Sequence, residues 1–183
     1  MTNQPKYAPG FLIAVPQLID PNFYHAVVLL IEHTAEGAMG LTINHPTNRS
    51  IKSLYDQMGR PWYGTDRDVL MRGGPVQPEQ AWILHGPGCS AGATYRVTDG
   101  IFLNTSLEAL DELTRTRAPF RFLVGYAGWG PGQLDREIQE GAWILSDVDP
   151  DLVFVTPSED VWEASLRRMG IDPAMLVPTT GVH

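Results

Sequence analysis

The chain has 183 residues, of which 43% are hydrophobic and 19% are charged, and 13 basic against 21 acidic side chains leave a net charge of −8. This size and composition predict a single globular domain with a sizeable core and argue against disorder, while the negative charge disfavours direct DNA binding as a main function. The one cysteine, Cys89, excludes an internal disulfide framework and suits a reducing compartment.

Short apolar runs separated by glycine and proline predict a series of β-strands from the N-terminus onward. Residues 11–15 form the first run, and residues 26–31 are apolar and β-branched throughout, which indicates a strand buried on both faces. The run at residues 38–44 follows a turn at Glu36-Gly37, so we expect it to pair with the preceding strand as a hairpin. Further strands are predicted at residues 69–72, 81–85, 94–97, 120–126, 142–145 and 152–155.

Four helices are predicted from the helical spacing of apolar side chains and from cap residues. Thr105 and Glu108 match the capping box that begins a helix, and Ser158 is placed as the N-cap of the last helix. Gly59 stands where a left-handed residue ends a helix. The predicted helices cover residues 51–58, 105–113, 133–139 and 158–169.

Many short strands with four helices and no strict alternation predict an α+β fold. We expect one compact domain over residues 1–183, in which about four helices flank a mixed, mostly antiparallel sheet. A sheet that curls into a barrel-like shape is an alternative within the same class. Residues 1–9 and 175–183 are expected to be loosely ordered tails. No segment approaches the roughly 20 apolar residues that span a membrane, and the N-terminus lacks a signal-peptide pattern, so no membrane association and a cytoplasmic location are expected.

The histidines and the cysteine form no recognisable reactive motif. Glu32 and His33 are neighbours that would point to opposite faces of a strand, and Cys89 lies in a Gly-Pro loop with nothing to fix it against a base. The histidines that lack the spacing of a metal site are His25, His33, His45, His85 and His183. The sequence therefore predicts no metal site and no cofactor, and it leaves any catalytic residue unassigned.

Two glycine-rich turns are the best candidates for binding. Residues 125–134 run from a strand into a short helix, where bare N–H groups suit an anion, although a tight structural turn explains the same glycines. At Arg72-Gly73-Gly74 a guanidinium at a strand end suits a carboxylate or phosphate, or else pairs with a structural carboxylate. The residues predicted to line a cleft for a ligand or partner are Asp20, Glu32, His33, Asn44, Arg72, Gly73, Gly74, Gly128, Trp129, Gly130 and Gln133.

A series of short motifs recurs in a definite order along nearly the whole chain. These motifs are FLIAVP (11–16), DPNF (20–23), EH (32–33), EGAMGL (36–41), Asn44, Pro46, GGPV (73–76), LH (84–85), GYAGW (125–129) and GQL (132–134). Together they resemble the AlgH/YqgE family of bacterial proteins over residues 10–170. Asp135 stands where that family is expected to have glutamate, and Arg72 and the loop at residues 86–90 are particular to this chain.

The resemblance implies a single cytosolic α+β domain and supplies no catalytic residue to carry over, and the family name comes from a proposed role in regulating alginate production. One hypothesis is therefore a regulatory or interaction protein without catalytic activity, such as a transcriptional regulator, that acts through a protein partner. The alternative is an enzyme or small-molecule binder that holds a small anionic ligand in a cleft between the Gly73-Gly74 and Gly128–Gly132 turns.

Overall fold

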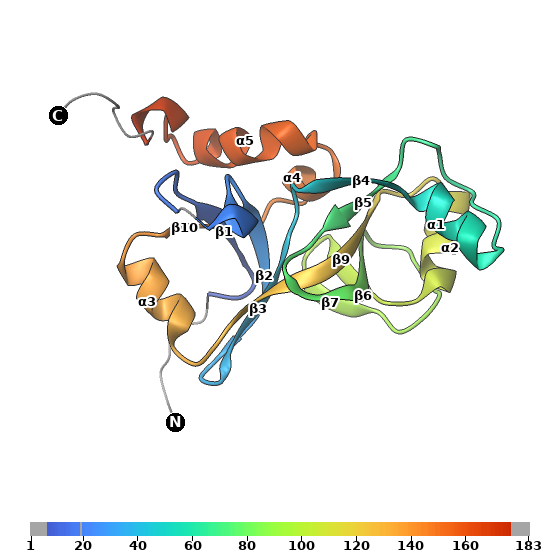
Figure 1. Ribbon diagram of the computed structural model, residues 1–183, viewed down its shortest axis with the longest axis horizontal. Coiled ribbons are helices and arrows are strands. Elements are labelled where there is room, and N and C mark those ends of the chain that lie inside the picture. The colour runs from blue at the N-terminus through green and yellow to red at the C-terminus, as the bar shows by residue number, and fades with distance from the viewer. Residues whose placement is uncertain (1–6, 19, 177–183) are drawn as a thin grey trace.

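The architecture, taken from a computed structural model that describes residues 7–18 and 20–176, is built on one long, curled β-sheet (Figure 1). Within these residues the sheet has ten strands. They are β1 (Gly10–Ala14), β2 (Val27–Thr34), β3 (Gly37–Thr42), β4 (Pro46–Ser50), β5 (Val69–Arg72), β6 (Val76–His85), β7 (Tyr95–Thr98), β8 (Ile101–Asn104), β9 (Phe120–Trp129) and β10 (Trp143–Ser146).

The sheet is mixed and mostly antiparallel, as predicted. Its main path runs β10-β1-β2-β3-β9-β6-β8-β7, and β5 joins β9 as the parallel pair while β4 pairs with β5. Strands β2 and β3 form the predicted hairpin. The ten-residue strand β9 connects the two ends of the sheet, because it pairs with β3 at its C-terminal end and with β6 along most of its length.

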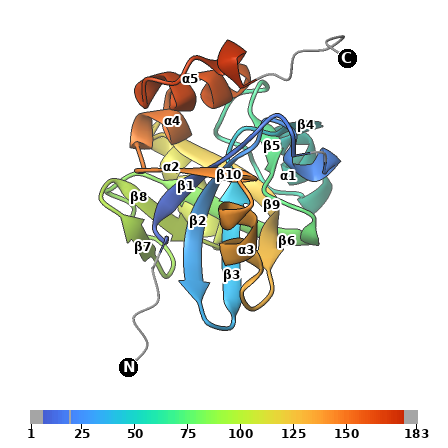
Figure 2. The same cartoon turned by 90° about the vertical axis from the view of Figure 1, so that its left-hand side faces the viewer.

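The helices lie outside the sheet in three groups (Figures 1 and 2). Helices α4 and α5 run over one face of the β1–β3 end, α3 lies beside β10 and β3, and α1 and α2 lie at the opposite end of the molecule. Their bounds are α1 (Ile51–Met58), α2 (Leu107–Arg115), α3 (Gln133–Gln139), α4 (Pro150–Phe154) and α5 (Val161–Arg168), with 3-10 turns η1 (Pro21–Phe23), η2 (Ser158–Asp160) and η3 (Pro173–Met175). No helix among the described residues is both long and apolar enough to cross a membrane.

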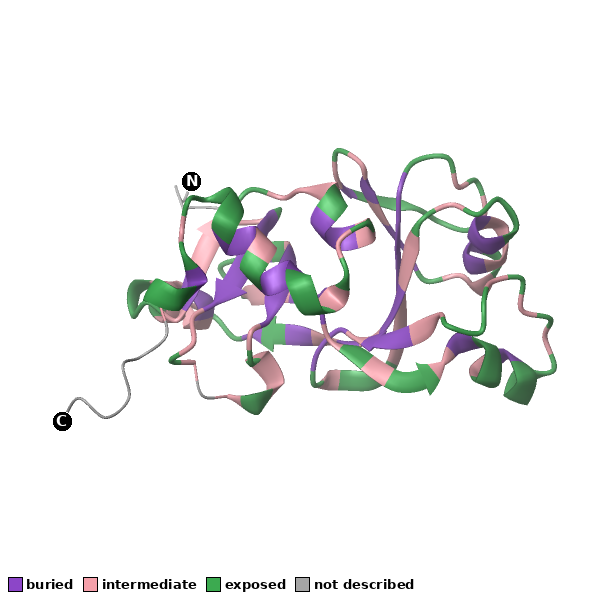
Figure 3. Cartoon of the chain, turned by 90° about the horizontal axis from the view of Figure 1, so that it is seen from above, coloured by how far each residue is buried: buried purple, intermediate pink, exposed green. Residues whose placement is uncertain are grey.

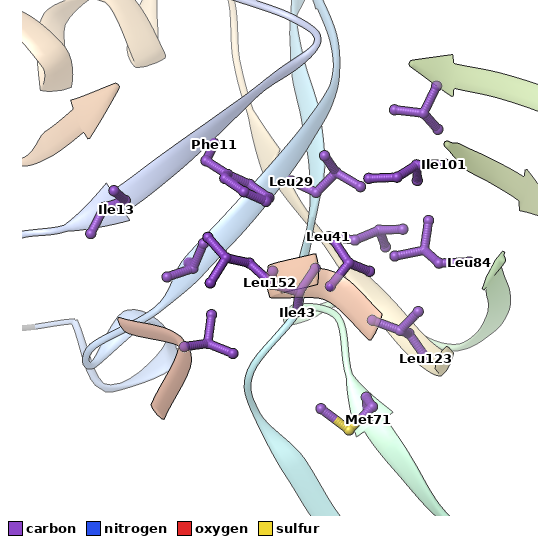
Figure 4. Close-up of a cluster of buried hydrophobic side chains, with 14 of the residues drawn as sticks. Phe11, Ile13, Leu29, Leu41, Ile43, Met71, Leu84, Ile101, Leu123 and Leu152 are labelled. Atoms are coloured by element: carbon purple, nitrogen blue, oxygen red, sulfur yellow. The ribbon is translucent and has the colours of Figure 1, made fainter. Parts of the chain in front are cut away.

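Burial follows the alternation of side chains along the strands. Phe11 and Leu29 point to one face and pack with α4 and α5, in the cluster of Figure 4. Leu12 and Leu30 point to the other face and pack under α3. A third cluster fills the end closed by α1 and α2. Because β1 and β2 are covered on both faces, their buried runs are continuous. Figure 3 shows exposed residues on loops, on outer helix faces and on parts of other strands.

Several predicted boundaries need correction. Residues 152–155 are not a strand: Pro150–Phe154 is helix α4, because the Asp149 carboxylate caps the Asp151 N–H and proline fits the first helical turn. The second helix is capped by Ser106 rather than Thr105, through a bond from the Glu108 N–H to its hydroxyl. Ser158 begins a 3-10 turn, and α5 starts after it.

Two strands of the sheet were not predicted, one predicted helix end is confirmed, and most of the two predicted tails lies outside the described residues. Strand β4 escaped prediction because its residues are polar, and the four-residue strand β8 was also missed. Gly59 ends α1 with a left-handed φ of 69°, as predicted. Residues 1–6 and 177–183 of the two predicted tails lie outside the described residues.

Candidate functional site

A cleft with a volume of about 590 Å³ lies at the tip of the β2–β3 hairpin, where this hairpin meets β9 and the first half of β6. It lies on the sheet face that α4 and α5 cover elsewhere, because Met39, Trp82 and Tyr126 of its lining pack against the same core cluster as these helices. Three of the predicted site residues line it, namely Glu32, Gly128 and Trp129. The other lining residues are Thr34, Glu36, Gly37, Ala38, Met39, Gln77, Gln80, Trp82 and Tyr126.

A bulge in β2 aims Glu32 into this cleft. The β2–β3 register pairs Leu30 with Gly40 but Glu32 with Met39, so Ile31 is an extra residue on β2. Without the bulge, simple alternation would place Glu32 on the same face as Leu30. The extra residue instead places Glu32 beside Met39, on the cleft face. His33 is therefore sent to the opposite face, as the sequence predicted for these two neighbours.

A second bulge, in β6, builds the opposite wall. Val76 pairs with Tyr126 and Ala81 with Val124, so the four residues Gln77–Gln80 stand opposite Gly125 alone. Gln77 has a φ of 45°, a left-handed conformation that few residues other than glycine adopt. Backbone held in such a conformation is concentrated at functional sites, where the surrounding structure compensates its cost. The bulge brings Gln77 and Gln80 to the cleft.

The apolar wall consists of two aromatic rings from neighbouring strands. Trp82 on β6 and Tyr126 on β9 meet edge to face, with ring centroids 6.3 Å apart and planes at 89°. Both side chains are only partly buried. The indole Nε1 of Trp82 is out of contact with solvent and has no hydrogen-bond partner among the described residues. The electron-rich faces of such rings attract alkyl chains and cations.

The floor is formed by Gly128 and Trp129 at the end of β9. A Cβ atom added to Gly128 would meet the nearest ring atom of Tyr126 at 3.4 Å, an ordinary contact, so glycine leaves this part of the cleft open without being required by its backbone. Trp129 is 6% exposed and faces the other side of the sheet. Its Nε1 donates to Glu137 Oε1 (3.0 Å), which also accepts from Trp143 Nε1 (2.9 Å).

The charged groups of the cleft are acidic. Glu32 and Glu36 are exposed carboxylates, and Glu36 Oε2 accepts a bond from the Thr34 hydroxyl. Among the described residues, no lysine, arginine or histidine lines the cleft. Carboxylates, amides and aromatic faces around one opening suit a cationic or amphipathic group better than an anion.

The predicted glycine turns are not joined in this cleft. Gly73 and Gly74 do not line it; they let β5 approach β9, since a Cβ at Gly74 would overlap the backbone of Tyr126. Gly73 N–H donates to the Val124 carbonyl. In the second turn, Gln133 Oε1 accepts the Gly130 N–H (3.0 Å), so a side chain of the protein takes the place that the prediction gave to an anion.

The remaining predicted site residues lie in two other places. Asp20 caps its own turn by accepting the Asn22 N–H, and Arg72 donates to the Asn22 amide oxygen (2.8 Å) instead of pairing with a carboxylate. Buried Asn44 accepts the Val27 N–H and donates to the His25 carbonyl. His33 is buried on the α3 side and lies 3.5 Å from the Asp135 carboxylate.

Asn44 leads to a smaller cleft of about 240 Å³ beneath η2 and α5. His25, in a left-handed conformation with a φ of 49°, is stacked between the rings of Tyr24 and Trp162. Burial lowers the pKa of the His25 imidazole, and the nearby Glu163 carboxylate opposes this shift. Burial also lowers the pKa of His45, although the hydrogen bond with the Tyr24 carbonyl acts in the opposite sense.

Sequence reasoning missed the β6 side of the main cleft. Gln77, Gln80 and Trp82 were not among the predicted site residues, because the bulge is defined by the register with β9; Tyr126, on β9 itself, was also missed. Pro78 was the available signal, since proline in a strand marks an edge or a bulge.

Comparison with known proteins gives a consistent result. The chain matches the sequence model of a family described as AlgH-like over residues 11–174. A UPF0301 protein of Anaeromyxobacter dehalogenans is 43% identical over 177 residues, covering 91% of this chain and 90% of that protein. A UPF0301 protein of Myxococcus xanthus is 40% identical over 179 residues, covering 96% and 98%.

Two solved structures share the fold. The solution structure of the AlgH protein from Pseudomonas aeruginosa is 30% identical, with a TM-score of 0.77, and covers 100% of this chain and 99% of that one. A crystal structure of a protein from Corynebacterium diphtheriae, at 21% identity and a TM-score of 0.76, covers 98% of this chain and 95% of that one. The second likeness concerns the fold alone.

Proposed function

The chain belongs to the AlgH-like family, and from its structure we propose that it is a non-catalytic interaction protein that binds a basic segment of a partner in the cleft between the β2–β3 hairpin and β6. The observation that carries the proposal is the combination of two exposed carboxylates, Glu32 and Glu36, with the exposed parts of Trp82 and Tyr126 around one opening.

The chemistry of the lining selects the partner. A lysine or arginine side chain would lay its alkyl stem against Trp82 and Met39 and place its charged head between the carboxylates of Glu32 and Glu36. The amides of Gln77 and Gln80 offer hydrogen bonds to the backbone of the same segment. A volume of about 590 Å³ accommodates one or two such side chains rather than a folded domain.

The proposed biological role is regulation, in which this protein sequesters or docks the partner whose basic segment it binds. The net charge of −8 favours basic partners at long range as well. We place the proposed interaction in the cytoplasm, in keeping with the single free thiol of Cys89.

The proposal is tested by titrating small probes into the 15N-labelled full chain. The probes are N-acetyl-lysinamide and N-acetyl-argininamide, with uncharged N-acetyl-norleucinamide and an acidic N-acetyl-glutamate amide as references. Both basic probes should shift the indole Nε1–H resonance of Trp82 in a saturable manner, and added salt should weaken the effect, because the carboxylates are exposed. The acidic probe should leave the resonance unchanged.

Two variants locate the binding. Gly128→Leu fills the floor of the cleft without backbone strain and should abolish the shifts, while Gly128→Ala should keep most of the response. The double variant Glu32→Gln, Glu36→Gln should lose the preference for basic over uncharged probes. Glu140→Gln, which removes one exposed carboxylate at the C-cap of α3 outside the cleft, should not. Equal shifts with basic and acidic probes, or basic shifts that survive Gly128→Leu, would contradict the proposal.

A further inference from the structure

A second cavity of about 260 Å³ lies at the junction of β5, the first residues of β9, and η2. It is separate from the cleft described above and shares no lining residue with it. Its lining is mixed: Val69, Met71 and Pro157 are apolar members, and its charged members are Arg67, Arg121 and Asp68.

Arg121 is the unusual member of this cavity. Its guanidinium donates to two backbone carbonyls, those of Phe120 and Phe154, at 3.3 Å each, which are long hydrogen bonds. Among the described residues, no carboxylate lies within ion-pair distance of it. Burial lowers the pKa of Arg121, and the nearby charge of Asp68 opposes this shift. A partly desolvated cation with several unused donors therefore faces a cavity.

The nearby carboxylate does not fill this role. Asp68 Oδ2 accepts the Thr65 N–H at 2.8 Å, so the carboxylate is held in its own turn. Arg67 adds a second, exposed guanidinium to the rim. The two arginines together outweigh Asp68, which leaves one net positive charge on the lining.

We propose that this cavity binds a small organic anion, a carboxylate or phosphate monoester on a short apolar body, with its oxyanion on the Arg121 guanidinium and its body against Val69. The planar fork of arginine matches the two oxygens of such a group, and the charge-assisted bonds replace the long contacts with backbone carbonyls. The volume admits a ligand of only a few carbon atoms.

The test is an NMR titration of the 15N-labelled chain with sodium butyrate and with butyl phosphate, using butylamine and butanol as probes of the same body without negative charge. Saturable shifts of the Arg121 Nε–H and of the backbone N–H groups of Val69 and Ser158 are expected with at least one anion and not with butylamine or butanol. The two anion arms tell a carboxylate site from a phosphate site. Absence of saturable shifts with both anions overturns the proposal.

Variants separate anion binding from the support that Arg121 gives to the end of α4. Arg121→Lys keeps the positive charge but loses the planar guanidinium. It should weaken binding of the anion about tenfold, since one charge-assisted hydrogen bond contributes roughly that factor to the affinity. Arg67→Gln alters only an exposed rim residue and should also weaken binding, whereas Arg167→Gln, an exposed arginine of α5 outside the cavity, should not. Unchanged affinity in both Arg121→Lys and Arg67→Gln contradicts the assignment.

Discussion

Glu137 provides the sharpest test of how the floor of the main cleft is held. One oxygen of its carboxylate accepts both indole N–H groups of Trp129 and Trp143, and the other accepts from Gln133 Nε2 at 2.9 Å. Trp129 and Trp143 are 6% and 3% exposed, so neither indole can turn to solvent instead. The substitution Glu137→Met keeps a similar volume but leaves both buried donors without an acceptor.

The magnitude follows from these contacts. Two charge-assisted hydrogen bonds at about 1.5 kcal/mol each give a loss of about 3 kcal/mol in the free energy of unfolding. For a chain of this length that loss corresponds to a Tm about 9 °C lower. Glu137→Gln is the matched control: its amide oxygen still accepts from the indoles, and about 1 kcal/mol is expected from the conflict with the Gln133 amide.

The measurement is urea unfolding of both variants, followed by tryptophan fluorescence at neutral pH. The reasoning predicts the order wild type, Glu137→Gln, Glu137→Met, with a clear gap between the two variants. A Glu137→Met variant within about 1 kcal/mol of the wild type would refute it, because the buried indoles would then have found other partners.

Three further predictions concern the frame around the site. Burial, and then the hydrogen bond with Asp111, raise the pKa of the Tyr55 hydroxyl above 10.0. The free energy of unfolding should therefore fall as the pH rises above that value, and Tyr55→Phe should reduce this fall when urea unfolding is measured at a series of alkaline pH values. Burial lowers the pKa of His45 below 6.5, so stability should fall as the pH drops below that value, and a His45→Gln variant that kept the full slope would contradict this. Gly125→Ala should lower the free energy of urea unfolding by more than about 2 kcal/mol, because φ is +75° and the new Cβ would overlap the Gly74 carbonyl. Gly141→Ala, with φ +82° and open space, should cost only about 1 kcal/mol in the same assay.

The sequence predicts the strands with the most regular burial and fails where tertiary context decides. The runs at β1, β2 and β3 are recognisable because covered strands need apolar side chains on both faces. The segment around Leu152 and Val153 has the same apolar character, yet it is a helix because Asp149 and Pro150 start one. Local composition alone does not distinguish a strand from a helix here. The helix could be predicted only by giving the Asp149-Pro150 start signal more weight than the apolar run.

The candidate site was predicted only on one side. Glu32, Gly128 and Trp129 belong to motifs that stand out in the chain, whereas Gln77 and Trp82 reach the cleft through a register shift between β6 and β9. A shift of this kind exists only in the paired sheet. The same limit applies to the two glycine turns, between which a shared cleft was predicted. Nothing in their spacing shows that Gly73 faces β9 and that Gly130 contacts Gln133.

The central claim is that the cleft at the β2–β3 hairpin takes a basic segment, and selection from a random peptide library on the immobilised full chain tests it most directly. Peptides are kept only when they bind the wild type and fail to bind Gly128→Leu, so that every retained sequence depends on the cleft. The account predicts that these peptides are enriched in lysine or arginine flanked by aliphatic residues. Cleft-dependent peptides enriched in aspartate or glutamate, or a selection in which no peptide depends on the cleft, would contradict it.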